Sequence, residues 1–383
     1  MTRGAGSSGA GPALLVCGGA VMDHVVRPFA SEQQGASYTS MPGEARVSPG
    51  GVGRNLAEVA ALLGSPVALT SAVGDDGAGA ALLSACRESG IDVQEVLVRS
   101  DSRTATYTAL LDGRGELVGA VADMAILEEI DAKQIAQSCA DLAGIGVVLC
   151  EGNLNEQALE AALQRCAAKQ IPAWFDPVSV AKAPRGCLRL PWQLAAPNID
   201  ELLAMLGKPP LASNWQAGFP APLRAAVEEA LQPGAGFAER LLLSLGPAGC
   251  LLASRDPSSA SNREHLRDIE LDVAAMVATD DATPLPPLHI QLQDPMPGSR
   301  CELLWYRLTK PLSAVRDVTG AGDALLAGTA AAFVTGWPLE EAVIAGMAAA
   351  HVTLFTDGSV ARQLRPAMLD MIKAVLHSRR SRL

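Results

Sequence analysis

Short apolar runs alternate with helical patterns along the middle of the chain, and this alternation restricts the fold more than any other feature of the sequence. The runs GIGVVLCEG (144–152), IPAWFDPV (171–178) and LLLSLGPAGCLLA (241–253) have the character of buried strands, whereas residues 156–169 follow a helical spacing. Strands that alternate with helices form a parallel sheet covered on both faces. We therefore predict an α/β fold around a central, mostly parallel sheet.

Composition and charge limit the partners of the chain. With 49% hydrophobic and 19% charged residues among 383, the chain has ample apolar material for a core. Its formal charge of −11 repels polyanions, so we expect no nucleic acid partner. No apolar run approaches the ~18 residues that span a membrane, so we expect no membrane partner. Since the eight cysteines include no C-x-x-C pair and the five histidines are scattered, no zinc site is predicted.

Changes of composition along the chain predict its organisation. Residues 1–12 are rich in Gly, Ser and Ala and are predicted to be a disordered N-terminus, residues 13–370 a single domain, and residues 371–383 a C-terminal tail. The segments 25–47 and 101–125 are predicted to form strands outside the main core, the second as a hairpin. The polar and proline-rich segment 254–298 is predicted to be a surface insertion with one short strand at LHIQL.

The stretch DVTGAGDALLAG (317–328) places glycines and two acids directly before a helical run. The N-terminus of a helix carries unpaired N–H groups and partial positive charge, and glycines let an anion approach them closely. Gly320, Ala321 and Gly322 are therefore candidates for an anion hole. Asp323, in the first turn, is a candidate base that accepts a proton from an attacking hydroxyl, and these donors should keep it ionised near neutral pH. The same residues also suit a simple helix cap with tight packing.

Five stretches of the chain resemble, in order, the motifs of the ribokinase-like (PfkB) carbohydrate kinases. They are SPGGVGRNLAEVAALLG (48–64), SAVGDDGAG (71–79), PNIDEL (197–202), SLGPAG (244–249) and DVTGAGD (317–323). This resemblance implies a ribokinase-like three-layer sandwich, with a small β-sheet lid formed by about 25–47 and 101–125. It also implies ATP-dependent phosphorylation of an alcohol on a small sugar or nucleoside, with Asp323 as the base.

The resemblance further assigns binding roles to residues at matching positions. The acceptor hydroxyls would be held by Asp23, Gly50, Gly51 and Asn55. Asn198 and Glu201 would act on Mg²⁺ through its waters. The ATP site would be lined by Ser244, Gly246 and Gly249, while Asp317 and Thr319 would offer oxygens to a monovalent cation such as K⁺. Alternatives stay open: Asp23 also suits a turn, and Asn55 and the Asn198–Glu201 pair also suit helix caps.

Three stretches resemble the pseudouridine kinases within this family, namely SPGGVGRN, YTALLDGRGELVGAVADM (107–124) and DPVSVAK (176–182). They imply pseudouridine as the acceptor, with a ribokinase, another sugar or nucleoside kinase, or a non-catalytic regulator on the same fold as alternatives. A polar lid face with Thr106, Thr108 and Asp123 is expected to read the edge of the uracil base, although Asp123 also suits a solvated strand end. Lys182 is expected to reach a phosphate, or otherwise to be exposed.

The chain ends in Ser381-Arg382-Leu383, which is similar to the S-K-L address that a peroxisomal receptor binds. We therefore predict import into a peroxisome-type microbody, with the cytoplasm as the alternative. The family resemblance also implies a homodimer that pairs through the lid.

Overall fold

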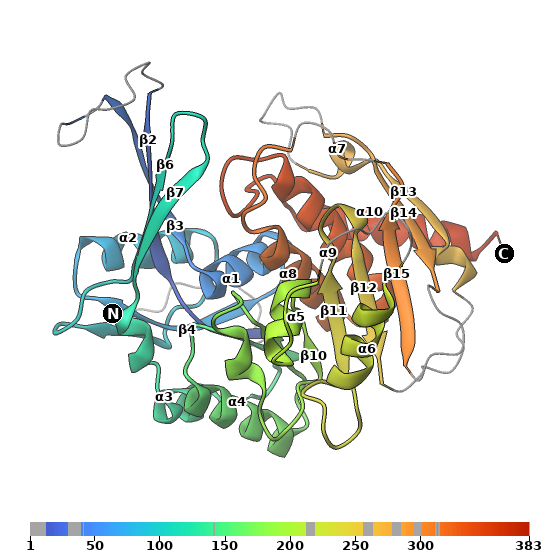
Figure 1. Cartoon of the computed structure of the whole chain (residues 1–383), viewed down its shortest axis with the longest axis horizontal. Helices are drawn as coiled ribbons and strands as arrows, with labels where there is room; N and C mark the ends of the chain where they lie inside the picture. Colours follow the sequence, from blue (N-terminus) through green and yellow to red (C-terminus); the bar gives the residue numbers. More distant parts are fainter. Residues whose placement is uncertain are drawn as a thin grey trace, which may run out of the picture.

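The structure, a computed structural model, describes residues 13–29, 40, 42–140, 142–211, 219–255, 263–277, 285–294, 301–310, 312 and 315–382. These residues form one large sheet and one small sheet, with helices on both faces of the large one (Figure 1). The predicted α/β sandwich with a small β lid is therefore confirmed. The prediction for residues 1–12 lies outside the described residues.

The large sheet has the strand order β13-β14-β15-β12-β11-β10-β9-β8-β1-β4-β5. Neighbouring strands from β11 to β5 are parallel, whereas β12 to β15 pair antiparallel at the other edge. The bounds are β1 (Leu14–Cys17), β4 (Val67–Gly74), β5 (Val96–Arg99), β8 (Val147–Glu151), β9 (Ala173–Asp176), β10 (Leu194–Ala195), β11 (Arg240–Ser244), β12 (Cys250–Ser254), β13 (Asp268–Leu271), β14 (Leu288–Gln293) and β15 (Glu302–Leu308).

Alternating side chains of the central strand β1 divide the core into two halves. Leu14 and Val16 pack with apolar residues of α1, α8, α9 and α10, whereas Leu15 and Cys17 pack with those of α3, α4, α5 and α6. The helix bounds are α1 (Val52–Leu62), α2 (Gly77–Glu88), α3 (Ala132–Ser138), α4 (Glu156–Lys169), α5 (Ile199–Met205), α6 (Ala221–Ala230), α7 (Val273–Met276), α8 (Ala321–Val334), α9 (Leu339–Leu354) and α10 (Ala367–Arg380).

The helix that carries the DVTGAGD motif is held tightly in the core. Most residues of α8 are buried, and α8 packs along α9 with little space between the backbones. A Cβ atom on Gly328 would lie 2.9 Å from the Cα atom of Gly346, so the close crossing depends on glycine. This packing fixes the position of the first turn of α8, near the carboxyl ends of the parallel strands.

The small sheet forms a lid that projects from the main body, at the upper left of Figure 1. Its strand order is β3-β2-β6-β7, with bounds β2 (Val21–Pro28), β3 (Gly43–Gly50), β6 (Thr106–Leu111) and β7 (Leu117–Asp123). The predicted lid segments 25–47 and 101–125 overlap these strands. Only residues 18–20 separate β1 in the large sheet from β2 in the lid, so the lid begins directly at the carboxyl end of the central strand.

The segment 254–298 differs from the predicted surface insertion. The expected strand at LHIQL is part of β14, but β14 and β13 extend the large sheet rather than stand apart from it. Most apolar side chains of the two strands are buried, among them Ile269, Leu271 and Ile290. The alternation of apolar and polar residues in DIEL and LHIQL is the reason, because each strand turns one apolar face to the core.

The segment 371–383 also differs from the predicted tail. Most of it belongs to α10, whose residues Met368, Ile372 and Leu376 lie four apart and face the core. No helix in the described part of the chain is long and apolar enough to cross a membrane.

Candidate active site

The candidate site lies where the parallel strands end. Cys17 ends β1 before Gly18-Gly19, Glu151 ends β8, Asp176 ends β9, and Ser244 ends β11. In open α/β sheets, ligands bind in the crevice at the carboxyl ends of the strands. The first turns of α1 and α8 reach the same crevice, since Asn55 of α1 contacts Asp323 of α8.

Asp323 is buried and held by a neighbouring amide. Its Oδ2 atom accepts a hydrogen bond from Asn55 Nδ2 at 2.7 Å, and Asn55 Oδ1 accepts one from Ser359 Oγ at 3.3 Å. Burial raises the pKa of Asp323 to about 6, against the lowering effect of Asn55 and Arg54. At pH 7 such a group is still ionised about tenfold more often than it is protonated. The Asp323 carboxylate is held by Asn55, and its role as the base stays a prediction.

The predicted anion hole is the N-terminus of α8. Gly320 caps the helix with φ 77°, and a Cβ atom there would lie 1.9 Å from the Ser359 carbonyl oxygen, so only glycine fits. A Cβ atom on Gly322 would meet nothing within 4 Å, which leaves open space in front of the first helical turn. The first N–H groups of a helix have no partner within it. The Ala321 N–H donates a long hydrogen bond to the Val318 carbonyl oxygen at 3.4 Å, so Gly322 is the residue of this turn whose N–H can be presented to an anion.

A cavity of about 420 Å³ opens beside these residues. The predicted nucleotide residues Ser244, Gly246 and Gly249 line it together with Ala321 and Gly322. The rest of the lining is mostly apolar and comes largely from β14, β15, α8 and α9: Leu288, Leu308, Leu325, Met347, Ala350 and Leu354. Such a mainly apolar cavity with a polar end suits a flat base whose phosphates point to the α8 N-terminus.

The predicted acceptor residues lie at the base of the lid. Asp23 of β2 pairs with Ser48 of β3, and a Cβ atom on Gly50 would fall 1.9 Å from Asp23 Oδ2. Gly51 caps α1 with φ 92°, and its Cβ would lie 2.5 Å from the Gly19 carbonyl oxygen. Burial raises the pKa of Asp23 to about 6; Arg54 lowers it and Asp323 raises it further. The charge of Asp323 therefore makes ionisation of Asp23 less favourable.

Asn198 and Glu201 form a capping box at the start of α5. Asn198 Oδ1 accepts from the Glu201 N–H at 2.9 Å, and Glu201 Oε2 accepts from the Asn198 N–H at 2.8 Å. These two hydrogen bonds match the helix-cap alternative. Burial raises the pKa of Glu201, and the charge of Asp323 raises it too, so the capped carboxylate also faces the site.

Two buried acids at the site were not among the predicted residues. Asp176 ends β9; burial and repulsion from Asp323 and Glu201 raise its pKa well above the ordinary value. Glu151 ends the neighbouring strand β8, and burial raises its pKa to about 7. The signal was present in the sequence, because each acid ends a predicted strand of the parallel sheet, and those ends meet at one edge.

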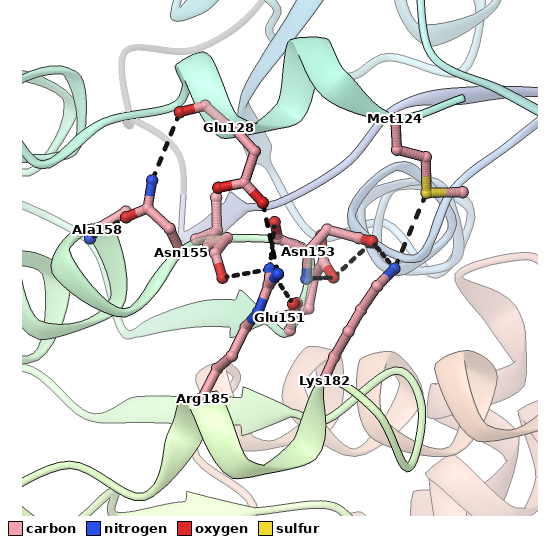
Figure 2. Close-up of polar contacts among 10 residues, drawn as sticks. Met124, Glu128, Glu151, Asn153, Asn155, Ala158, Lys182 and Arg185 are labelled. Carbon is pink, nitrogen blue, oxygen red and sulfur yellow. Dashed lines mark hydrogen bonds and ion pairs between the residues drawn. The ribbon is translucent and has the colours of Figure 1, made fainter. Parts of the chain in front are cut away.

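Glu151 connects the Gly18-Gly19 segment after β1 to a cluster of polar side chains (Figure 2). Its Oε1 atom accepts from the Gly19 N–H at 2.5 Å, while Oε2 accepts from the N–H and Nδ2 of Asn153, each at 2.7 Å. Asn153 Oδ1 accepts in turn from Lys182 Nζ, which lies 3.8 Å from Met124 Sδ. The cluster thus reaches the end of the lid at Met124.

The phosphate contact of Lys182 stays a prediction. Lys182 lies against Asn153 and the lid, and it is not among the residues that line the cavity of about 420 Å³. The 3-10 turn η2 (Ala183–Gly186), which begins directly after it, holds it at the end of β8. Burial lowers its pKa, whereas the charge of Glu151 raises it.

Thr108 and Asp123 lie on the face of the lid opposite to Asp23, which corrects their predicted contact with the acceptor. Asp23 is in register with Tyr107, whereas Thr106, Thr108 and Asp123 belong to the alternate set of side chains. Asp123 instead pairs with Arg103 at 3.0 Å on the surface. The face on the side of Asp23 is therefore occupied by residues 107, 109, 120 and 122. This register depends on how the strands pair in the folded chain, and the sequence alone does not determine it.

Asp317 and Thr319 form a turn before α8. Asp317 Oδ1 accepts from the Thr319 N–H at 2.8 Å, and Thr319 is exposed. Within the described ranges, no group of three or more His, Cys, Asp or Glu side chains is placed to hold a metal ion. The monovalent cation stays a prediction.

Comparison with known proteins identifies the family and supports the fold. The chain is 26% identical to a pseudouridine kinase of Arabidopsis thaliana over 94% of both chains, and 39% identical to a pseudouridine kinase of Escherichia coli over 37% of this chain and 45% of that protein. Its fold matches an Arabidopsis thaliana ribokinase solved with ribose and ATP, with a TM-score of 0.64, 17% identity, and coverage of 96% and 99%. Residues 13–279 and 306–364 match the pfkB family carbohydrate kinases, so the chain belongs to this family.

Proposed function

We propose that this chain transfers the γ-phosphoryl group of ATP to the 5′-hydroxyl of pseudouridine. Membership of the family makes the chain a phosphotransferase with an alcohol acceptor. One observation supports the site of transfer: Asp323, held by Asn55, lies at the α8 N-terminus between the apolar cavity and Asp23 at the base of the lid.

In the proposed reaction, the acceptor hydroxyl loses its proton to the Asp323 carboxylate as its oxygen attacks the γ-phosphorus atom. The bond from that phosphorus to the oxygen of the leaving ADP breaks. The N–H groups at the start of α8 hold the charge that develops on the phosphoryl oxygens. Most of the rate gain comes from this positioning and charge stabilisation, because the fold holds Asp23, Asp323 and the N-terminus of α8 in place.

The donor set also suits Mg²⁺. Asp176, Glu201 and Asp323 are buried carboxylates that repel one another, and a divalent cation nearby would relieve this repulsion. Mg²⁺ keeps several waters and needs few protein ligands, so the lack of a three-ligand cage among the described residues fits it. Glu201 and Asp176 would hold such an ion through its waters; when bound, it would neutralise charge on the ATP phosphates.

The identity of the acceptor is the finer part of the proposal. The full-length Arabidopsis thaliana relative is named a pseudouridine kinase, which supports pseudouridine, whereas ribose or another nucleoside is the alternative. ATP consumption should be assayed with pseudouridine, uridine, ribose and adenosine. We expect the highest kcat/KM with pseudouridine. A preference for ribose would make the chain a ribokinase, and no turnover with any acceptor would favour a non-catalytic regulator.

Replacement of the base tests the mechanism directly. We expect Asp323→Asn to lower kcat by about 10²–10⁴-fold with little change in acceptor affinity, because an amide keeps the shape but accepts no proton. Steady-state kinetics with the preferred acceptor measure this change, and calorimetry measures acceptor binding. If the variant retains a near-normal kcat, Asp323 is not the base.

A further inference from the structure

His351 is a buried polar side chain that lines the cavity of about 420 Å³ beside the α8 N-terminus. It lies in the last turn of α9 and is 2% exposed. The residues of α9 that line the cavity with it are apolar, namely Met347, Ala350 and Leu354. A polar group in such surroundings is costly unless it is hydrogen-bonded. The proposed reaction does not use this side chain.

One ring nitrogen of His351 has a hydrogen-bond partner and the other has none. Nε2 lies 2.8 Å from the carbonyl oxygen of Pro286, just before β14. Because a carbonyl oxygen only accepts, this bond assigns the ring proton to Nε2. Burial lowers the pKa of His351, against the raising effect of the Pro286 contact, so the ring is mainly neutral near pH 7. Nδ1 is then an acceptor, and it is buried without a partner within the described part of the chain.

The fold holds the ring of His351 in this orientation. Phe355, one turn further along the chain, is 3% exposed and packs against the ring with the centroids 5.1 Å apart. Rotation of the ring toward another partner would break the bond from Nε2 to Pro286. The donor that Nδ1 lacks is therefore expected from the molecule that occupies the cavity.

The bases of nucleotides differ in the group that would face such an acceptor. Adenine carries an amino group, which donates a hydrogen bond, whereas guanine carries a carbonyl oxygen at the same place, which only accepts. That oxygen would meet Nδ1 as a second acceptor and leave both atoms unpaired. A ribose hydroxyl also donates, but the apolar neighbours of His351 suit the flat face of a base better than a polar sugar.

We propose that His351 selects adenine nucleotides, because its Nδ1 atom accepts a hydrogen bond from the amino group of the base. The inference rests on the proposed function, in which the cavity holds ATP, and it names the residue that distinguishes ATP from GTP and ITP. Since this contact forms equally in the bound nucleotide and in the transition state, its loss should raise KM for the nucleotide and leave kcat nearly unchanged.

The test compares ATP with ITP, whose base carries a carbonyl oxygen in place of the amino group. For the wild type we expect kcat/KM with ATP to exceed that with ITP about 10–100-fold. His351→Phe keeps a flat ring and removes both nitrogens, so this ratio should fall about tenfold or more. His289→Phe is the control, because His289 of β14 does not line the cavity, and it should keep the wild-type ratio. A purely structural role of His351 would weaken both nucleotides equally, and an unchanged ratio in His351→Phe overturns the inference.

Measurements on the wild type keep the test decisive if His351→Phe does not fold. Nitrogen-15 NMR of labelled histidine distinguishes a protonated ring nitrogen from an unprotonated one. We expect Nδ1 of His351 to be unprotonated, and to shift when the β,γ-imido analogue of ATP binds but much less with that of ITP. A protonated Nδ1, equal shifts with the two analogues, or no binding of either overturns the inference.

Deoxynucleotides separate the base from the sugar as the source of the donor. The 2′-deoxy and 3′-deoxy forms of the ATP analogue should shift Nδ1 as the parent analogue does, and loss of the shift with either form would assign the donor to the ribose and overturn the adenine contact. These binding measurements need no acceptor. Failure of the proposed function would show separately, as nucleotide binding without turnover of any acceptor.

Discussion

Single atoms decide the geometry at the base of the lid. Asp23 Oδ2 occupies the space that a Cβ atom on Gly50 would need, and the Gly19 carbonyl oxygen occupies the space next to Gly51. These glycines are therefore required because another group has taken the place of a side chain. The motif SPGGVGRN therefore needs glycine at these two positions because of close contacts, and not only to form a turn. Through Gly50, the motif packs against Asp23.

The contact between Gly50 and Asp23 leads to a prediction. Gly50→Ala places a methyl group on the carboxylate, which must move away from the acceptor, so we expect KM for the acceptor to rise about 10–100-fold, the loss of a hydrogen bond to a charged group. Steady-state kinetics measure this rise. Gly119→Ala is the control, because its Cβ would meet no atom within 4 Å on lid strand β7. Equal KM values for the two variants would contradict the role of Gly50.

At the scale of elements, the start of α5 combines a cap with an acid that faces the site. The Asn198–Glu201 box satisfies backbone N–H groups that a short helix would otherwise leave unpaired. The sequence left the cap and the magnesium role as alternatives. The structure shows that they are compatible, because the hydrogen bonds of the box use only one Glu201 oxygen, Oε2.

The capping box predicts a measurable loss of stability. Asn198→Ala removes the acceptor for the Glu201 N–H, and we expect the free energy of unfolding to fall by about 1 kcal/mol. Urea unfolding followed by circular dichroism measures it. Asn198→Asp keeps an acceptor at the same place and should be close to the wild type. A wild-type unfolding midpoint in Asn198→Ala would show that the cap does not stabilise the chain.

Elements also show where sequence reasoning succeeded and failed. The turn from Gly320 to Asp323 at the start of α8 was predictable, because its backbone geometry is local. Asp176 and Glu151 were missed because their proximity arises from the order of strands in the sheet, which is set by packing over long range. Thr108 was assigned to the wrong face, since a pleated strand alternates its faces and the register to β2 is a tertiary property.

At the scale of the whole molecule, the outer face of the lid carries several exposed apolar side chains. Val26, Val47, Leu110 and Val121 lie on the side opposite to Asp23 and are 36–69% exposed. Exposed apolar patches of this kind commonly mark surfaces that bind another protein. This placement supports the proposal that two copies of the chain pair through their lids.

The lid face predicts the oligomeric state. In the double variant Val47→Lys with Val121→Lys, charge on both lids would repel the partner, and we expect a dimeric wild type to become a monomer. Sedimentation velocity measures the mass of each. Val98→Lys alters an exposed valine of β5, outside the lid, and should stay dimeric. A dimer that survives the double substitution would place the interface elsewhere.

The direct passage from β1 into β2 has a mechanical consequence. If the lid swings about residues 18–20, displacement grows with distance along the strand, as along a lever. Asp23 lies three residues beyond this pivot and Pro28 eight, so the tip would travel more than twice as far as the acid. Any opening of the lid by this route would therefore also move Asp23, by more than a third of the distance that Pro28 travels.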